Sequence, residues 1–222
     1  MHASRPDPVT CRQVTYRLLP RKTSTWRWLE RVLEEQRQLY DAALQERVDC
    51  WHQEGKSLTW RDQFKSLTRC RREIPGMEDV AVAIQRGTLK RLDDAMQDFF
   101  RRTKAGLGGF PRFKGCRHWN SISIISGVRI RGNSLQIPRY GQMTVRRRGG
   151  SPDGVPRSAI LKREGGKWYA VVAVAIPAPV HDDNGHAIGI DMNAGQIATS
   201  DGMVIPALGT GRLKARAKRY RR

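Results

Sequence analysis

The spacing of apolar residues changes twice along this 222-residue chain, and that change limits the folds open to it. Val14–Leu19 alternates apolar and polar side chains, which predicts a short strand that Pro20 ends. From Ser24 to Lys104, apolar residues recur every three or four positions, as on the buried faces of helices. After Gly109 the period returns to two, in short runs separated by Gly, Asn or Pro. This order predicts an α+β fold in which helices are inserted into a sheet.

Three helices are predicted in the middle segment, each bounded by polar start signals and by Gly or Pro stop signals. We expect the first from a Thr23 or Ser24 cap to about residue 50, the second over Leu58–Arg72 behind a Thr59 cap, and the third over Glu78–Lys104.

The second half of the chain predicts a β-meander. Alternating segments are expected to form strands at Ser121–Ile125, Val128–Arg131, Ser134–Ile137, Met143–Arg148, Ser158–Arg163 and Lys167–Ile176. Gly132-Asn133 and Gly165-Gly166 are typical of two-residue hairpin turns. The apolar run YAVVAVAIP, residues 169–177, indicates a central strand. Together these features predict a small barrel of the oligonucleotide-binding type with a helical lobe inserted after its first strand.

The charge of the chain indicates a polyanionic partner. Lys and Arg number 41 against 21 Asp and Glu, which gives a formal net charge of +20. Nucleic acid is the first candidate for such a partner. A membrane is not expected, since the chain has neither an apolar run of about eighteen residues nor a signal-peptide pattern. Four widely spaced cysteines without a C-x-x-C pair predict neither a zinc site nor a disulfide framework.

Residues 109–115, GFPRFKG, combine two aromatic residues with two basic ones. Arg112 and Lys114 can neutralise phosphates, while Phe110 and Phe113 can stack on bases or pack in the core. Periodicity favours the core for the two rings. We therefore predict nucleic-acid contacts from Arg112 and Lys114.

Three runs of basic residues are predicted to be solvated faces that contact phosphates, given the net charge. They are Arg146-Arg147-Arg148, Arg69-Arg71-Arg72 and Arg101-Arg102-Lys104.

The segment HAIGIDMNAGQIATSDG, residues 186–202, predicts a buried strand AIGID that presents Asp191, a tight turn and a second strand QIATS. A carboxylate at the end of an apolar strand is typical of the first magnesium ligand of a nuclease. Metal-assisted cleavage needs further carboxylates, and Asp and Glu are both absent after Asp201. The alternative is an Asp that accepts a backbone hydrogen bond in a turn, and Asp201 fits this alternative better than Asp191 does.

Five segments in a fixed order resemble one known family. They are GKSLTW (55–60), LKRLDDAMQDFFRR (89–102), GFPRFKG (109–115), IRGNSLQIPRYG (130–141) and AIGIDMNAGQIATSDG (187–202). Together they resemble the TnpB (OrfB) proteins of insertion sequences, which are compact relatives of type V CRISPR effector nucleases. The resemblance extends over nearly the whole chain from about Val14.

The resemblance implies a domain organisation and a set of partners. A disordered lead-in (1–13) would precede a wedge barrel (14–23 and 109–180), a helical recognition lobe (24–108) and the start of a ribonuclease H-like (RuvC) segment (186–222). Guide RNA and target DNA would be partners, Mg²⁺ the cofactor, and Asp191 the first of three catalytic carboxylates. Trp60 and Gln85 match positions that contact the target-adjacent duplex. A prokaryotic, cytoplasmic location is implied.

The chain also departs from the family pattern. The second and third acids and the C-x-x-C zinc ribbon are absent, and Asn193 stands where Gly is usual. We therefore expect a truncated or split product, equivalent to the N-terminal half, that binds nucleic acid and does not cleave alone. Three alternatives stay open: a nuclease completed by a downstream polypeptide or by a second copy, a nuclease-dead regulator that binds DNA, and a remnant without function.

Overall fold

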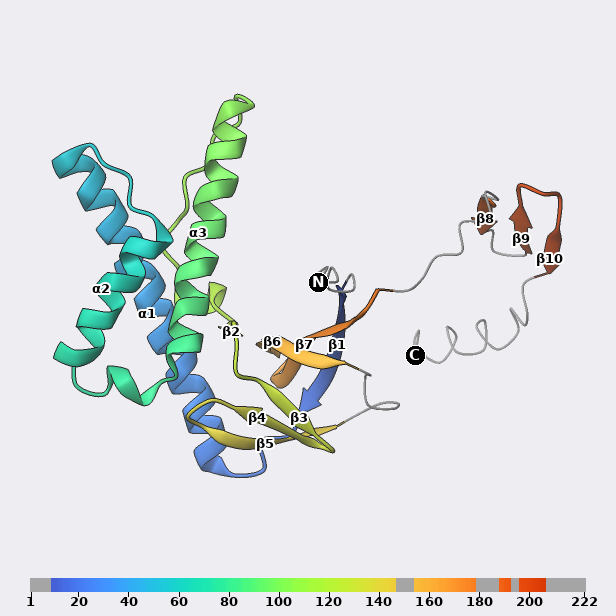
Figure 1. The fold of residues 1–222 in the computed structure, drawn as a ribbon, viewed down its shortest axis with the longest axis horizontal. Coiled ribbons are helices and arrows are strands. Elements are labelled where there is room, and N and C mark those ends of the chain that lie inside the picture. Colours follow the sequence, from blue (N-terminus) through green and yellow to red (C-terminus); the bar gives the residue numbers. More distant parts are fainter. Residues whose placement is uncertain (1–8, 147–153, 179–187, 193–195, 207–222) are drawn as a thin grey trace, which may run out of the picture. The chain divides into compact units, whose positions relative to one another are not determined.

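The computed structural model describes residues 9–146, 154–178, 188–192 and 196–206 (Figure 1). The chain divides into two compact units, Met1–Ala178 and Pro179–Arg222, and each is considered by itself.

The three predicted helices are confirmed. They are α1 (Thr23–Glu54), α2 (Trp60–Glu73) and α3 (Val82–Lys104). The third helix begins later than predicted, because a left-handed Gly76 (φ 80°) leads into a single 3-10 turn, η1 (Met77–Asp79). None of the described helices combines the length and the apolar character that a membrane-spanning helix requires.

Of the N-caps predicted for α1 and α2, the second is correct and the first is wrong. Thr59 caps α2 in a capping box, where its hydroxyl accepts a hydrogen bond from the Asp62 amide and the Asp62 carboxylate accepts one from the Thr59 amide. The Asp62 carboxylate also accepts a hydrogen bond from the Thr59 hydroxyl at 2.6 Å, and this bond, together with the one from the Thr59 amide, lowers the pKa of Asp62. For α1 the predicted cap is wrong, since the helix begins at Thr23 and the Lys22 cap position makes no side-chain hydrogen bond.

The first unit contains a seven-stranded antiparallel sheet. Its strands are β1 (Val9–Leu18), β2 (Ser121–Ile124), β3 (Arg129–Arg131), β4 (Ser134–Ile137), β5 (Gly141–Arg146), β6 (Val155–Glu164) and β7 (Lys167–Pro177). They pair in the order β2-β6-β7-β1-β5-β4-β3. The helices follow β1 and precede β2 in the chain, while β1 itself lies within the sheet between β7 and β5. The helices are therefore inserted after the first strand of the sheet.

The predicted α+β class is confirmed. Among the described residues, no strand pairing closes the sheet into a barrel. A closed barrel would pair the first and last strands of the order, and here β2 and β3 are instead the two edges. The predicted central strand is confirmed, since β7 pairs with both β6 and β1. Gly165 and Gly166, both at positive φ (55° and 68°), form the predicted two-residue turn between β6 and β7.

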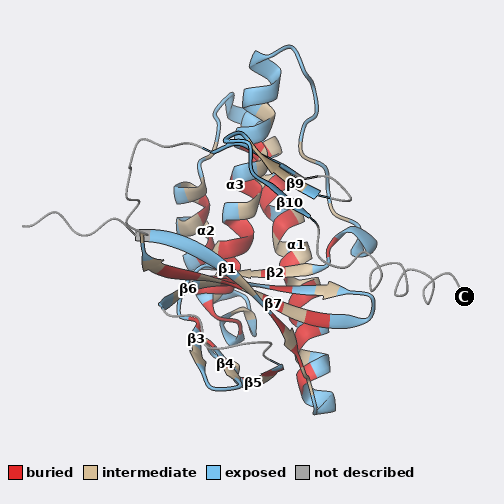
Figure 2. Cartoon of the chain, turned by 90° about the vertical axis from the view of Figure 1, so that its right-hand side faces the viewer, coloured by how far each residue is buried: buried red, intermediate tan, exposed pale blue. Residues whose placement is uncertain are grey.

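The core lies between the inward faces of the helices and one face of the sheet (Figure 2). On β7 every second residue from Trp168 to Val174 is fully buried, as the period of a strand requires. On the helices the buried residues recur every three or four positions as predicted, with Leu29, Val32 and Leu44 on α1 fully buried.

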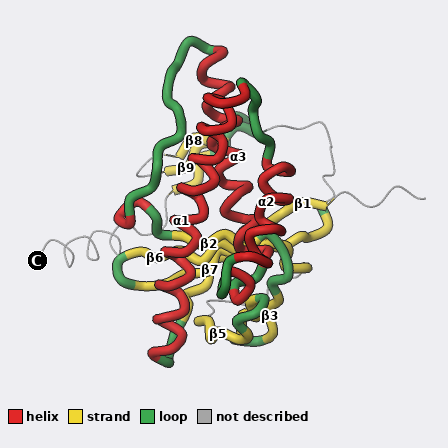
Figure 3. The backbone as a smooth tube through the Cα atoms, turned by 90° about the vertical axis from the view of Figure 1, so that its left-hand side faces the viewer, coloured by secondary structure: helices red, strands yellow, loops and turns green. Residues whose placement is uncertain are grey.

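The helices meet the sheet where α3 crosses β2, and Figure 3 shows the helices in red beside the yellow strands. Gly87 of α3 lies so close to β2 that a Cβ atom placed on it would be 2.5 Å from the Ser123 carbonyl oxygen. The Ile125 amide donates to the Ala83 carbonyl at 3.3 Å, one helical turn earlier. A helix therefore covers the exposed edge of β2, which would otherwise offer unpaired backbone groups.

The second unit contains a three-stranded antiparallel sheet of β8 (Ile190–Met192), β9 (Gln196–Thr199) and β10 (Val204–Pro206), in the order β10-β9-β8. The strand pair predicted around Asp191 is confirmed, while the predicted turn at 193–195 lies outside the described residues. The predicted burial of the first strand is wrong, because Ile188 and Ile190 are both exposed.

We predict that Gly87→Ala destabilises the first unit. In a free helix alanine is favoured over glycine by about 1 kcal/mol, but here the new methyl group would overlap the Ser123 carbonyl. The free energy of unfolding should therefore fall by about 1–3 kcal/mol, the usual cost of overpacking. Urea unfolding followed by circular dichroism measures this change.

Gly108→Ala is the matched control, since no atom lies within 4 Å of the Cβ position there. Its effect should stay within about 0.5 kcal/mol. A Gly87→Ala variant more stable than the wild type would show that α3 and β2 do not approach this closely.

Candidate nucleic-acid interface

Strand register places three basic residues and a tyrosine in one row across the sheet. Lys162 of β6 is opposite Tyr169 of β7, Tyr169 is opposite Arg17 of β1, and Arg17 is opposite Arg146 of β5. Residues directly opposite each other project from the same face of a sheet. The adjacent row, which includes Tyr16 and Leu161, is buried, so the row of Arg146, Arg17, Tyr169 and Lys162 lies on the outer face. We call these four residues the sheet row.

The sheet row sets two like charges opposite each other on neighbouring strands. Two like charges directly opposite each other on neighbouring strands are destabilising. In the described part of the chain, neither Arg17 nor Arg146 forms a salt bridge, whereas Lys162 pairs with Glu164 at 3.0 Å. A phosphate between the two guanidinium groups would relieve this repulsion.

Only one member of the sheet row is among the predicted site residues. Arg146 is exposed, as expected, while Arg147 and Arg148 lie outside the described residues. Arg17 and Tyr169 were missed, because each looks unremarkable within its own strand. Their pairing partners, which give them their significance, are distant in sequence.

The GFPRFKG segment is held against α1 by backbone hydrogen bonds. The Lys114 amide donates to Asp41 Oδ1 at 2.7 Å, and the Lys114 carbonyl accepts from Arg37 Nη1 at 2.9 Å. The ammonium group of Lys114 lies 5.6 Å from the centre of the Tyr40 ring. Arg112 is exposed, so its guanidinium group is free to meet a phosphate.

The two phenylalanines of this segment are not core residues, contrary to the prediction. Phe110 and Phe113 are 45% and 54% exposed. Phe110 packs edge-to-face on Phe99 of α3, with ring centres 5.2 Å apart. Both rings therefore keep surface on which a base can stack.

Trp60 is the first residue of α2 and is partly exposed. Its ring meets Phe64 edge-to-face at 4.9 Å, and the Arg61 guanidinium group lies 5.3 Å from its centre. A cation beside an indole ring suits contact with nucleic acid, but no observation here tests that role, which stays a prediction.

Gln85 lies inside the protein. It is 3% exposed, its amide nitrogen donates to the Met77 carbonyl at 2.8 Å, and its amide oxygen accepts from Arg71. A contact between Gln85 and a duplex would require both hydrogen bonds to break. The position favours a structural role, because Gln85 and Arg71 together hold the η1 turn against α3.

Arg71 differs from the predicted solvated face of the run Arg69-Arg71-Arg72. Its guanidinium group also donates to the Met77 carbonyl at 3.1 Å and to the Val80 carbonyl at 2.8 Å, so it is not part of a solvated face. Burial lowers the pKa of Arg71, and the nearby Arg139 lowers it further.

A buried ion pair connects the three helices. Arg47 of α1 lies 3.3 Å from the Asp93 carboxylate of α3, and its Nε donates to Gln63 Oε1 of α2 at 2.8 Å. The Gln63 amide nitrogen donates back to the Ala43 carbonyl of α1 at 2.8 Å. All three side chains are buried, and Asp93 is the carboxylate that pairs with the buried Arg47 charge.

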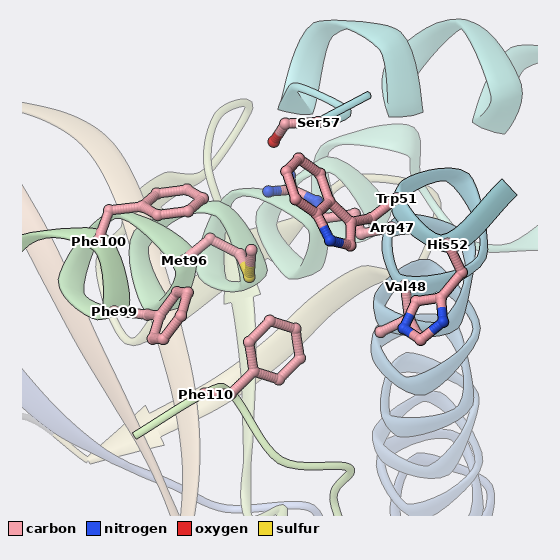
Figure 4. A pocket seen from close by; sticks show the side chains of 9 residues that line it. All are labelled: Arg47, Val48, Trp51, His52, Ser57, Met96, Phe99, Phe100 and Phe110. Atoms are coloured by element: carbon pink, nitrogen blue, oxygen red, sulfur yellow. The ribbon is translucent and has the colours of Figure 1, made fainter. Parts of the chain in front are cut away.

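Beside this ion pair is a pocket of about 460 Å³ that sequence analysis missed (Figure 4). It lies between the C-terminal halves of α1 and α3 and the segment that follows α3. Aromatic side chains dominate its lining, which consists of Arg47, Val48, Trp51, His52, Ser57, Met96, Phe99, Phe100 and Phe110. Trp51 and Phe100 could have been noticed, since both are large apolar residues within the last turns of their helices.

Asp191 pairs in register with Ala198 of β9 and is exposed. Asp201 accepts a backbone hydrogen bond in a turn, as the alternative interpretation predicted. Its carboxylate accepts hydrogen bonds from the Thr199 hydroxyl and from the Met203 amide, the latter at 3.4 Å. These hydrogen bonds lower the pKa of Asp201. Among the described residues, no group of three or more His, Cys, Asp or Glu side chains could hold a metal ion. The donors described do not by themselves suit Mg²⁺, which prefers several carboxylates.

One solved structure that the chain resembles is a cryo-EM structure of a Cas12f1–sgRNA–target DNA complex. The match covers 96% of this chain and 61% of that chain, with 13% sequence identity and a TM-score of 0.43. The chain thus spans less than two thirds of the length of the protein that it matches. No model of a protein family matches the chain, and no curated protein does.

We predict that Asp93→Ala strongly destabilises the helices. The change leaves the Arg47 charge buried without its counter-ion, and breaking a buried pair on one side costs about 3–5 kcal/mol. Chemical unfolding followed by helix circular dichroism measures the loss.

Asp94→Ala is the control from the neighbouring position. Asp94 is exposed and pairs with Lys90 at 2.8 Å, so its removal should cost no more than about 1 kcal/mol. Equal effects at the two positions would contradict a structural role for the Arg47–Asp93 pair.

Proposed function

We propose that this chain is the nucleic-acid-binding part of a TnpB-type RNA-guided DNA endonuclease, and that it binds guide RNA and target DNA. The ordered motifs from GKSLTW to AIGIDMNAGQIATSDG support the family, and the net charge of +20 supports a polyanionic partner. Backbone phosphates would supply most of the affinity, as in other basic proteins that bind nucleic acid.

The sheet row is the observation that carries this proposal. It sets Lys162 and Arg17 on either side of the partly exposed Tyr169, and Arg146 beyond Arg17, in one row on the outer face of the sheet. A folded protein lowers its stability when it sets two like charges opposite each other. A surface of this kind is favoured when the ligand is a polyanion, because the ligand removes the repulsion on binding.

In this proposal the two parts of the first unit have separate tasks. The sheet, with residues 14–23 and 109–180, is the wedge domain, a barrel of the oligonucleotide-binding type, and presents the sheet row to RNA. The helices, residues 24–108, are the recognition lobe, with Trp60 at the target-adjacent duplex. Arg112 and Lys114, on the segment that joins the two, would contact backbone phosphates.

Residues 186–222 would begin the nuclease domain, with Asp191 as a metal ligand. When Mg²⁺ is bound by enough carboxylates it stabilises the charge on the scissile phosphate. Asp191 alone does not fulfil that requirement, and the described residues gather no group of three or more metal-binding side chains. In this proposal the further carboxylates come from a downstream polypeptide or a second copy. We therefore assign binding, and no cleavage step, to the chain by itself.

We predict that the double variant Arg17→Gln, Arg146→Gln binds RNA more weakly and with less dependence on salt. Each lost phosphate contact should reduce the slope of log K against log salt by about 0.7 for single-stranded RNA, or about 1.4 for the pair. Fluorescence anisotropy of a labelled oligonucleotide over a range of KCl concentrations gives both values.

Protein stability provides an independent measurement. Removing two opposed charges should leave the melting temperature unchanged or raise it, so weaker binding cannot be attributed to unfolding. Arg31→Gln, which removes an exposed charge of α1 outside the sheet row, is the matched control and should leave the slope nearly unchanged. The proposal is refuted if the double variant keeps the wild-type slope.

We predict that Asp191→Asn leaves RNA affinity unchanged, within about twofold, because one exposed carboxylate outside the sheet row contributes little to binding. With RNA, Mg²⁺ and target DNA present, neither the wild type nor the variant should cut DNA. Gel analysis of the DNA gives the answer. Cutting by the wild type that the variant loses would instead favour a nuclease completed by a second copy of the chain.

A further inference from the structure

The aromatic pocket beside the Arg47–Asp93 pair is a preformed cavity. In Figure 4 the rings of Trp51, Phe99 and Phe110 and the side chain of Met96 surround the same space. Its volume of about 460 Å³ lies within the range of sites that bind small organic groups.

The chain positions Phe110 at the pocket by reversing its direction after α3. Gly106 and Gly109 both have positive φ (74° and 125°), a conformation that other residues rarely adopt. The Arg102 guanidinium group donates to the Gly109 carbonyl at 2.9 Å and fixes the residue before Phe110. Phe110 then packs on Phe99, so one wall of the pocket is held by two independent contacts.

The charged group that lines the pocket, Arg47, already has its partners within the protein. Arg47 is hydrogen-bonded to Gln63 and paired with Asp93, so its charge is compensated and does not call for an anion. The remaining walls are mainly aromatic. The pocket therefore suits a flat, uncharged group rather than a phosphate.

The aromatic walls are exposed to solvent without any cover in the described residues. Trp51 is 60% exposed, and Phe100 and Phe110 are also exposed. Burying such rings against a ligand is favourable by the usual hydrophobic gain. The occupant must therefore supply an apolar, planar surface.

The charges around the pocket indicate which kind of ligand carries this planar surface. On the α3 side, within four residues of Phe100 or Phe110, the only acid is Asp98 and the cations are Arg101, Arg102, Lys104, Arg112 and Lys114. The α1 side carries Asp49 and Glu54 near Trp51. A polyanion would therefore lie along the α3 side and direct a planar group into the pocket.

From these observations we infer that the pocket binds one unpaired nucleobase of single-stranded nucleic acid, stacked among Trp51, Phe100 and Phe110. The flanking phosphates lie along the basic C-terminal end of α3. This inference rests on the proposed nucleic-acid binding and adds a preference for unpaired bases. A base inside a duplex is already stacked and paired, so it does not enter the pocket.

Binding of a single-stranded oligonucleotide and of the matching duplex tests the inference. Trp51→Ala should weaken single-strand binding by about tenfold, the loss expected for one base–aromatic stack, and should change duplex binding by less than about twofold. Trp51→Phe should retain most of the affinity, because a smaller ring still stacks. Phe110→Ala should reproduce the Trp51→Ala result from the opposite wall.

A base analogue gives a direct readout of stacking. A 2-aminopurine placed in the oligonucleotide loses fluorescence when it stacks on an aromatic side chain. We expect this quenching with the wild type and not with Trp51→Ala at saturating protein. The analogue is preferable to intrinsic fluorescence because the chain contains six tryptophans.

Trp26→Ala is the matched control. Trp26 is also on α1 and is 37% exposed, but it lies 25 residues before Trp51, about 38 Å along the helix. Its removal should leave the difference between single-strand and duplex binding unchanged. Far-ultraviolet circular dichroism confirms that each variant folds.

The outcomes separate this inference from the proposed function. If the wild type binds neither RNA nor DNA, the proposed function fails and the inference fails with it. If the wild type binds and Trp51→Ala binds single strands equally well, only the pocket inference is overturned. A Trp51→Ala variant that changes its oligomeric state at unchanged RNA affinity would identify the pocket as a protein-docking site, which also overturns the inference.

Discussion

The close approach of α3 to β2 at Gly87 is the contact on which the first unit depends. The helices are inserted between β1 and β2, so the chain must return from the end of α3 to the far edge of the sheet. At Gly87 the absence of a side chain lets the helix lie against the Ser123 backbone, and the Ile125 amide finds its partner on α3. The same helix carries Asp93 of the buried ion pair and Phe99 and Phe100 of the pocket. The position of α3 on the sheet therefore also determines the geometry of the ion pair and of the pocket.

The two candidate surfaces rely on different physical interactions. The sheet row offers cations, whose attraction for phosphates is long-ranged, insensitive to base identity and weakened by salt. The aromatic pocket offers stacking, which acts at contact distance and is largely independent of salt. A protein with only the first would bind any polyanion. Adding the second gives a preference for nucleic acid that has unpaired bases, without requiring a particular sequence.

Sequence analysis predicted the elements well and the sites unevenly, because periodicity is a local property. The helices and the central strand followed from the spacing of apolar residues, and the hairpin turns at 132–133 and 165–166 followed from their residue types. Partners distant in sequence could not be predicted in this way. Arg17 gains its importance only from register with Arg146, Gln85 is buried where it accepts a hydrogen bond from Arg71, and Phe110 meets Phe99 after the positive-φ Gly109. Ile190 shows the same limit, since an apolar strand is buried only where another element covers it.

Not all of the Lys and Arg side chains that give the net charge of +20 are available to a ligand. Arg47 and Arg71 donate their hydrogen bonds within the protein, and Arg91 lies over the Trp119 ring at 4.2 Å. Arg37 donates to the Lys114 carbonyl and pairs with Glu34 and Asp41 of its own helix. Burial lowers the pKa of Arg91, as expected for a cation removed from water. A guanidinium group that serves the fold in this way cannot release counterions when RNA binds. The salt dependence of binding should therefore reflect the sheet row and the other exposed cations rather than the total charge.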